Sequence, residues 1–314
     1  MASATGIRTQ QMNSSAKGYI EQALSGLAPG KPYAIVDYPN YANPGDCAIW
    51  LGARRALESI YGYAPAYVST VRQFDARRCR EKTSEGTIFF LGGGNFGSLY
   101  EKHHRMRLRA LDKIADLRIV LLPLSVAERD PGNPALIAET RSVVERCLNL
   151  KVLVRERNSM KQLRETYRIE GQLCPDTAHW CHISDARPTT EAVGLFRKDG
   201  EALPGASGNH LPSGDVFDWR DNRTIMQMNR LGKISPLIPS RRLRLAAFDS
   251  VAKSKVKAAS KLLGRGNRVL TDRLHGVILA SLMKREVAAA DNKTGKVGAY
   301  VNTWPHLLPH VTLN

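Results

Sequence analysis

An arginine and a histidine stand two residues apart in the segment Thr271-Asp-Arg-Leu-His-Gly276. Arg273 offers a planar fork of N–H donors for a carboxylate or a phosphate, and His275 can move a proton near neutral pH. The segment follows a predicted strand, and Gly276 opens an apolar stretch predicted to be a helix, whose N-terminus can hold an anion. A plainer interpretation stays open, in which Asp272 pairs with Arg273 at the surface and His275 is an ordinary loop residue.

A second candidate, Asn43-Pro-Gly-Asp46, also lies between a predicted strand and a predicted helix. Its glycine permits a close approach of the backbone to a ligand. Asp46 could bind a substrate hydroxyl, or it could simply cap the adjoining helix. The residues alone do not choose between these two roles.

A third candidate, Gly92-Gly93-Gly94-Asn95, follows a predicted strand over residues 87–91. Successive residues without a Cβ let the backbone lie against a ligand and offer N–H groups to its oxygen atoms. The glycines at 92, 94 and 97 also meet the bare spacing of a dinucleotide-binding fingerprint. No Asp or Glu ends a strand about twenty residues later, because Asp112 falls in a helical stretch. We therefore do not expect a nicotinamide cofactor.

The fourth candidate is Lys296, within the segment from Asp291 to Val297. Gly295-Lys296 is suggestive of a phosphate loop, but Ala290 occupies the position five before this glycine and Val297 follows the lysine, so the motif is absent. What remains is a lysine at a strand-to-helix turn that could reach a phosphate or a carboxylate.

Alternating strands and helices must position these four segments, because open parallel sheets bind ligands at the carboxyl ends of their strands. The sequence predicts an α/β fold with doubly wound parallel sheets, in two Rossmann-like domains that face a cleft. We expect a tail and helix over residues 1–30, an N-terminal domain over 31–185 and a C-terminal domain over 186–314. Residues 197–222, with little periodicity, are predicted to be a loop. The expected strands are 33–36, 87–91, 118–123, 151–154, 192–196, 268–271 and 286–290, and the expected helices are 16–27, 47–60, 101–115, 240–263, 276–283 and a terminal helix or tail from 300.

The composition adds one strong signal, a net charge of +17 from 46 Lys and Arg against 29 Asp and Glu. Such an excess favours an anionic partner: nucleic acid, an acidic membrane surface, or a phosphorylated or carboxylated substrate. Five cysteines without a C-x-x-C pair predict neither a disulfide framework nor a zinc site. The apolar run 119–127 is roughly half a membrane span, and the N-terminus lacks an apolar signal segment, so we expect a cytoplasmic protein.

Taken in order, these segments resemble the polysaccharide pyruvyl transferase family. The resemblance covers residues 33–304 and also includes Val-Arg-Glu-x-x-Ser at 154–159, Cys-Pro-Asp at 174–176 and the late Gly-Lys-Val. It implies a fold similar to that of the two-domain (GT-B-like) glycosyltransferases. It also implies transfer of the pyruvyl group of phosphoenolpyruvate to a sugar of a cell-surface polysaccharide or its precursor, as a ketal.

The resemblance implies a role for each matching residue. His275 is the expected acid/base, and the cations Arg155, Arg273 and Lys296 are expected to hold phosphoenolpyruvate, which carries a carboxylate and a phosphate. Asp176 is expected to be structural, ending a strand and capping the next turn of the chain. This chemistry needs no metal and no cofactor beyond phosphoenolpyruvate as co-substrate. The residues expected to lie toward the acceptor are Asp46, Gly93, Gly94 and Asn95.

Two other functions remain as alternatives. A glycosyltransferase using a nucleotide sugar could share the same scaffold. A basic nucleic-acid-binding protein is suggested only by the net charge, since aromatic residues make up just 7% and no nucleic-acid module is recognisable. The cationic runs 102–109 and 241–268 instead suggest attraction to an anionic membrane surface or to a lipid-linked acceptor there. The enzyme would then be peripheral on the inner face of the membrane.

Overall fold

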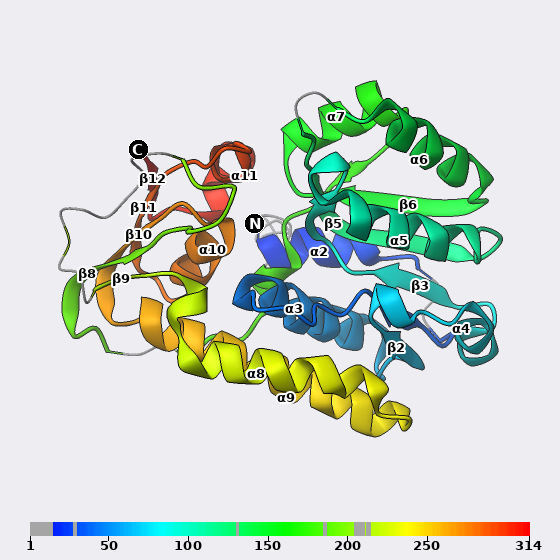
Figure 1. Ribbon diagram of the computed structural model, residues 1–314, viewed down its shortest axis with the longest axis horizontal. Coiled ribbons are helices and arrows are strands. Elements are labelled where there is room, and N and C mark those ends of the chain that lie inside the picture. Colours follow the sequence, from blue (N-terminus) through cyan, green and yellow to red (C-terminus); the bar gives the residue numbers. More distant parts are fainter. Residues whose placement is uncertain (1–14, 28–29, 130–131, 185–186, 204–210, 212–214) are drawn as a thin grey trace, which may run out of the picture. The chain divides into compact units, whose positions relative to one another are not determined.

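The computed structural model describes residues 15–27, 30–129, 132–184, 187–203, 211 and 215–314 (Figure 1). These residues form two compact units. The first unit comprises Met1–Tyr38 and Ala53–Trp180, and the second comprises Pro39–Gly52 and Cys181–Asn314. The segment 39–52, which carries the Asn-Pro-Gly-Asp motif, therefore clusters with the C-terminal part of the chain.

The first unit is built on a sheet whose described strand pairs are all parallel, in the order β2-β1-β3-β5-β6-β7, with β4 also beside β5. Its strands are β1 (Ala34–Val36), β2 (Tyr67–Ser69), β3 (Thr87–Phe90), β4 (Gly93–Phe96), β5 (Arg118–Val126), β6 (Asn149–Val154) and β7 (Gln172–Leu173). The helices are α2 (Ala16–Leu24), α3 (Pro44–Tyr61), which continues from the second unit, α4 (Ala76–Thr83), α5 (Glu101–Asp112), α6 (Pro134–Arg146) and α7 (Arg157–Tyr167).

The central strands of this sheet are buried on both faces. Ile88 packs in a core cluster with Leu108 of α5 and Leu136 of α6, while its neighbour Phe89 points to the opposite face and is also fully buried. Because successive side chains of a strand alternate between faces, such a strand must be apolar throughout. This continuous apolar character explains why β3 and β5 are predictable from the sequence.

The second unit carries a smaller parallel sheet with the strand order β12-β11-β10-β8-β9. Its strands are β8 (Thr190–Leu195), β9 (Val216–Phe217), β10 (Gly266–Thr271), β11 (Glu286–Ala289) and β12 (Val311–Leu313). Its helices are α8 (Arg223–Ile234), α9 (Arg241–Leu263), α10 (Leu274–Leu282) and α11 (Lys296–Thr303). Two short 3₁₀ helices, Trp219–Asp221 and Ser235–Leu237, flank α8.

The predicted α/β class with parallel sheets is confirmed, and each predicted strand overlaps an observed one. Two local predictions were wrong. The described part of the loop 197–222 contains β9 and a 3₁₀ helix, while residues 204–210 and 212–214 lie outside the described residues. Helix α11 begins at Lys296 rather than near residue 300, because the Asp291 carboxylate accepts the backbone N–H groups of Val297 and Gly298 at 3.2 Å each.

Among the described residues, no helix is both long enough and apolar enough to cross a membrane.

Candidate active site

Arg273 and His275 lie where β10 turns into α10, as the sequence predicts. The Thr271 hydroxyl at the end of β10 donates a hydrogen bond to the Leu195 carbonyl (2.8 Å) and accepts one from the Arg273 backbone N–H (3.1 Å). This pair of bonds fixes the turn, so that Arg273 stands at the N-cap of α10 and His275 in its first helical turn. Both side chains are largely buried, with exposed fractions of 8% and 9%.

Gly276 has a packing role in this turn. A Cβ at this position would lie 2.6 Å from the Thr271 hydroxyl oxygen and 2.8 Å from a methyl group of Leu195. Only a glycine therefore lets the first turn of α10 come this close to the sheet. The same contact holds His275 at the carboxyl end of β10.

Arg273 is held by acidic side chains from other parts of the unit. The Nη2 atom of Arg273 donates a hydrogen bond to the Asp218 carboxylate at 2.5 Å, and it lies 3.7 Å from the Asp199 carboxylate. The Asp272 carboxylate instead accepts the backbone N–H of Arg197 at 3.0 Å. The plainer interpretation of a surface pair between Asp272 and Arg273 was therefore wrong, because Arg273 is buried and its carboxylate partner is Asp218.

Further ion pairs continue from Arg273 to Lys296. Arg197 contacts Asp199 at 2.8 Å and Glu201 at 3.1 Å, and Glu201 lies 3.7 Å from the Lys296 ammonium. We call the six side chains with alternating charge the ion-pair chain. In order, they are Asp218, Arg273, Asp199, Arg197, Glu201 and Lys296.

The ion-pair chain gathers at one edge of the sheet because its strands are parallel. Thr271 is in register with Leu195 of β8 and Ala289 of β11, so the segments after these three strands leave the sheet together. The Asn292 amide links two of these segments by donating to the Asp272 carbonyl at 3.3 Å. Lys296 is the first residue of α11 and is 8% exposed.

Sequence reasoning missed Arg197, Asp199, Glu201 and Asp218. They lie within the segment predicted to be a featureless loop. The position of Arg197 in the sequence could have identified it. It comes two residues after the end of β8, at the same edge of the sheet as Arg273.

The Asn-Pro-Gly-Asp motif packs directly on His275. A Cβ at Gly45 would lie 2.3 Å from His275 Nδ1, so the first turn of α3 touches the imidazole. Asn43 organises this turn: its Oδ1 accepts the Gly45 backbone N–H (3.0 Å) and its Nδ2 donates to Asp46 (2.7 Å). Asp46 and His275, predicted separately, thus belong to the same neighbourhood.

Buried contacts with α9 hold this motif segment within the second unit. The Lys255 ammonium donates to the Tyr41 carbonyl at 2.9 Å, and the Trp50 indole N–H donates to Asp249 at 2.8 Å. Burial lowers the pKa of Lys255. A charged group that is buried away from water is stable only when it makes hydrogen bonds within the protein. The bond from Lys255 to Tyr41 therefore helps to fix the loop that precedes α3.

Arg155 belongs to the first unit and follows β6. Its Nε donates to the Ser125 hydroxyl and its Nη1 to Asp176, both at 2.6 Å. Asp176 is fully buried and also accepts the Ala178 backbone N–H at 2.8 Å, which caps a short 3₁₀ helix as predicted. The two motifs Val-Arg-Glu and Cys-Pro-Asp therefore meet in one buried ion pair.

The glycine-rich segment of the first unit forms strand β4 beside β5. A Cβ at Gly92 would lie 2.1 Å from the Pro123 carbonyl oxygen. Gly93 has a backbone φ of 110°, a conformation that residues with a Cβ rarely adopt. The packing at Gly92 and the backbone conformation at Gly93 are therefore sufficient reasons for these two glycines, and no bound ligand is needed to explain them. Gly94 and Asn95 are only partly buried, and Asn95 accepts a hydrogen bond from Arg107 at 2.7 Å.

The same arginine connects Asn95 to a buried carboxylate. Arg107 donates to Asp37 at 2.6 Å, and His103 Nε2 lies 2.9 Å from the same oxygen. Burial by itself would raise the pKa of Asp37, but His103 and Arg107 outweigh it and lower the pKa to about 2. Asp37 is therefore ionised at any working pH, and it organises this end of the first sheet.

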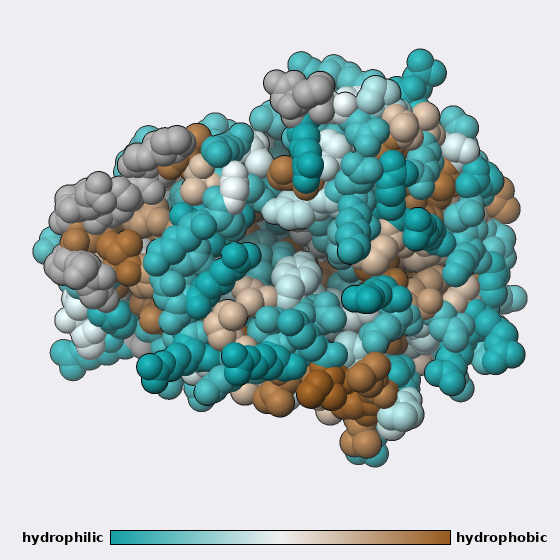
Figure 2. Space-filling model, in the orientation of Figure 1, coloured by the Kyte–Doolittle hydropathy of each residue, from teal (hydrophilic) through white to brown (hydrophobic). Residues whose placement is uncertain are grey.

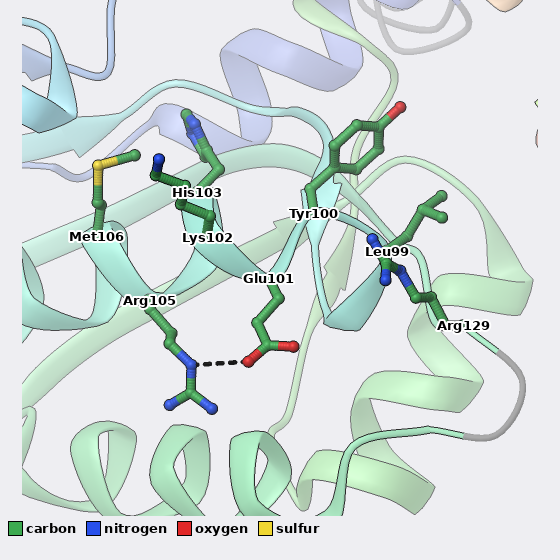
Figure 3. Close-up of a pocket in the computed structure, with 8 residues that line it drawn as sticks. All are labelled: Leu99, Tyr100, Glu101, Lys102, His103, Arg105, Met106 and Arg129. Atoms are coloured by element: carbon green, nitrogen blue, oxygen red, sulfur yellow. Dashed lines mark hydrogen bonds and ion pairs between the residues drawn. The ribbon is translucent and has the colours of Figure 1, made fainter. Parts of the chain in front are cut away.

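An open pocket lies beside this cluster, at the start of α5 (Figure 3). Tyr100 is 41% exposed, and its ring points away from the paired side chains of Glu101 and Arg105. Basic groups dominate the rest of the lining, and sequence reasoning did not identify this pocket. The lining residues are Leu99, Tyr100, Glu101, Lys102, His103, Arg105, Met106 and Arg129.

The chemistry that these groups can perform is anion binding and proton transfer. Arg273, Arg197 and Lys296 could hold a small anion with two acidic groups, and His275 could exchange a proton with it. Within the described residues, no three His, Cys, Asp or Glu side chains are grouped as metal ligands.

Comparison with known proteins identifies the family. The family model for polysaccharide pyruvyl transferase matches residues 43–294. The chain is 28% identical to "Putative pyruvyl transferase EpsO" of Bacillus subtilis (strain 168), over 94% of this chain and 93% of that protein. It is 23% identical to "Pyruvyl transferase 1" of Schizosaccharomyces pombe, over 92% of this chain and 72% of that protein.

A solved structure supports the fold. A functionally uncharacterised protein from Klebsiella pneumoniae superposes with a TM-score of 0.60 at 16% identity, covering 100% of this chain and 99% of that one. At this identity the likeness concerns the fold alone. The family assignment rests on the match over residues 43–294, which includes the segments around Asp46, Arg155 and His275. The chain belongs to the polysaccharide pyruvyl transferase family and is an enzyme of that class.

Proposed function

We propose that the enzyme transfers the pyruvyl group of phosphoenolpyruvate to two hydroxyls of a saccharide, forming a ketal and releasing phosphate. One observation carries this proposal: His275 stands at the same sheet edge as an ion-pair chain that includes Arg273 and Lys296. A substrate with both a carboxylate and a phosphate matches such a set of cations.

The donor is assigned to the cations of the ion-pair chain. Arg273 presents a planar fork suited to a carboxylate, while Lys296 supplies a point charge suited to a phosphate. Their positions are set by Asp218 and Glu201, so that little reorganisation is needed when charge develops during the reaction. Arg155 is kept as a third donor-binding cation on the strength of the family resemblance.

His275 is assigned the proton transfers. Its imidazolium gives a proton to the methylene carbon C3, which leaves C2 with cationic character. A first sugar hydroxyl attacks C2, and its proton returns to the imidazole. The C2–O bond to phosphate then breaks, and a second hydroxyl closes the ketal while its proton leaves with the phosphate. The products are one ketal and one inorganic phosphate.

The acceptor is assigned to the partly exposed polar groups that remain. Asp46 can accept a hydrogen bond from a sugar hydroxyl, and its orientation is fixed by Asn43. In the first unit, Gly93, Gly94 and Asn95 are kept as acceptor candidates on the strength of the family resemblance. The acceptor is proposed to be a lipid-linked precursor of a cell-surface polysaccharide.

The decisive experiment measures phosphate release from phosphoenolpyruvate with a panel of saccharides, both soluble and lipid-linked. We expect phosphate to form only when acceptor is present, with the acceptor mass rising by one pyruvate less one water. Arg273→Lys serves as the matched control, because it keeps the charge and loses the planar fork. Absence of phosphate across the panel, together with consumption of a nucleotide sugar, would overturn the proposal.

A further inference from the structure

Four large apolar side chains are exposed where α8 leads into α9 in the second unit. Their exposed fractions are 53% for Leu231, 62% for Ile234, 68% for Leu237 and 61% for Leu243. Figure 2 shows apolar side chains gathered over these two helices. We call this surface, over residues 230–243, the α8–α9 tip.

The helices beneath the α8–α9 tip pack closely together. Gly232 lies on the inner side of α8, where a Cβ would approach Val251 of α9 to 3.3 Å, so the two helices are closely packed. Ser235 and Pro236 are buried beneath the turn, while the adjacent Leu237 points outward. The exposed apolar residues are therefore held outside by an ordered core.

In the sequence, cations lie among these apolar residues, and the same stretch contains no acids. Between Asp221 and Asp249 the sequence contains six Lys or Arg and no Asp or Glu. Arg230, Lys233 and Arg242 are exposed, and within the described part of the chain the structure records no ion pair for any of them. The surface combines positive charge with exposed apolar area.

Of the two cationic runs in the sequence, 241–268 begins at the α8–α9 tip, whereas 102–109 lies in the first unit and is paired differently. In the segment 102–109, Arg105 is paired with Glu101 and Glu139, and Arg107 is buried against Asp37. Much of that charge is consumed by internal ion pairs. The free positive charge that could meet an outside partner is better developed at the α8–α9 tip.

We propose that the α8–α9 tip is a docking surface for a bilayer rich in anionic lipids. Apolar side chains beside Lys and Arg suit the boundary between headgroups and acyl chains, where the cations meet lipid phosphates and the apolar groups enter the hydrocarbon. A second copy of the same tip fits poorly, because its cations would face identical cations. The inference does not depend on the donor chemistry proposed above.

The test is sedimentation of the full chain with vesicles of phosphatidylcholine alone or mixed with phosphatidylglycerol. We expect binding only to the anionic vesicles, weakened by salt because headgroup charge is screened. At about 1 kcal/mol for each cation, removing one weakens binding about fivefold, so Arg230→Gln/Lys233→Gln/Arg242→Gln lowers the affinity about 100-fold. Leu237→Ser should lower it about tenfold.

Matched controls lie in the first unit. Leu148 is 81% exposed and Arg77 is exposed on α4, so Leu148→Ser and Arg77→Gln remove similar groups elsewhere and should leave vesicle binding unchanged. Activity on a soluble saccharide should be the same in the tip variants as in the wild type, which separates this inference from the proposed reaction. Equal binding to neutral vesicles, or unchanged binding by the tip variants, would overturn it. So would a Leu237→Ser variant that changed only the oligomeric mass in solution, because a second copy would then be the occupant.

Discussion

Gly45 and His275 are in direct contact, although one lies near the start of the chain and the other near its end. The absence of a Cβ at Gly45 is what allows the first turn of α3 to rest on the imidazole, because the added atom would lie 2.3 Å from Nδ1. The Asn-Pro-Gly-Asp motif therefore sets the position of the proposed acid/base, and it also carries Asp46, which is proposed to bind the acceptor.

This contact predicts the effect of Gly45→Ala. The new methyl group must push the imidazole aside, and a displacement of about 1 Å can reduce turnover on the order of 10²-fold. Steady-state kinetics with phosphoenolpyruvate should show the loss in kcat. Gly132→Ala is the control, since a Cβ there meets nothing within 4 Å. An unchanged kcat for Gly45→Ala would show that the imidazole position is not critical.

Replacing the imidazole itself tests proton transfer. His275→Ala should fold normally and lose turnover by about 10²-fold or more, because general acid–base catalysis typically contributes 10²–10⁴-fold. Circular dichroism and thermal unfolding report on the fold, and phosphate release reports on turnover. Wild-type turnover in this variant would remove His275 from the mechanism.

The buried pair of Arg273 and Asp218 predicts coupled effects. Asp218→Asn takes away the charge that holds the guanidinium at 2.5 Å, so we expect a higher KM for phosphoenolpyruvate and a lower melting temperature. In a double-mutant cycle with Arg273→Lys, residues in contact should show a coupling of about 0.5–3 kcal/mol. Strictly additive effects would mean that the two side chains act independently.

His104 predicts a pH dependence of stability. Burial, with smaller contributions from Arg107 and other cations, lowers the pKa of His104 to about 3, below its ordinary 6.5. Its Nε2 bonds to the Thr140 hydroxyl at 2.9 Å, whereas the buried Nδ1 has no hydrogen-bond partner among the residues that the structure describes, so nothing there would accept an added proton. The folded state therefore keeps His104 neutral, while the unfolded chain protonates it below pH 6.5.

The stabilising contribution of His104 is thus complete above pH 6.5 and is lost as the pH falls toward 3. At pH 5 the loss amounts to about 2 kcal/mol. Denaturant titrations of wild type and His104→Gln between pH 7 and pH 5 measure it as a difference. The two proteins have to be compared because Asp272 has the opposite effect on the pH dependence. Burial raises the pKa of Asp272 to about 6, so this carboxyl group stabilises the folded state as the pH falls. Parallel pH profiles for the two proteins would contradict the prediction.

The parts of the fold that depend on local sequence were predictable. Strand β3 is recognisable because its residues are mostly apolar and bounded by turns, and Arg273 and Lys296 were correctly placed after strands. Helix α8 was missed because Leu231 and Ile234 are apolar yet exposed, so its pattern does not report burial.

The contacts within the site could not be predicted from local patterns. Arg197 pairs with acids two and four residues away, which resembles ordinary surface charge in a sequence. Asp218 directly follows β9, and it meets Arg273 because β9 pairs with β8 and β8 pairs with β10. Without the strand order, nothing in the sequence distinguishes Asp218 from other aspartates.

The ion-pair chain has a consequence for how the proposed donor would be recognised. Its three cations, Arg197, Arg273 and Lys296, are matched by three carboxylates, so the assembly has no formal net charge despite the +17 of the whole protein. In the proposed reaction, the donor therefore meets cations whose charge is already balanced, and it is selected by the direction of their N–H groups rather than by excess positive charge. Asp218 and Glu201 then act as the frame that keeps this geometry in place.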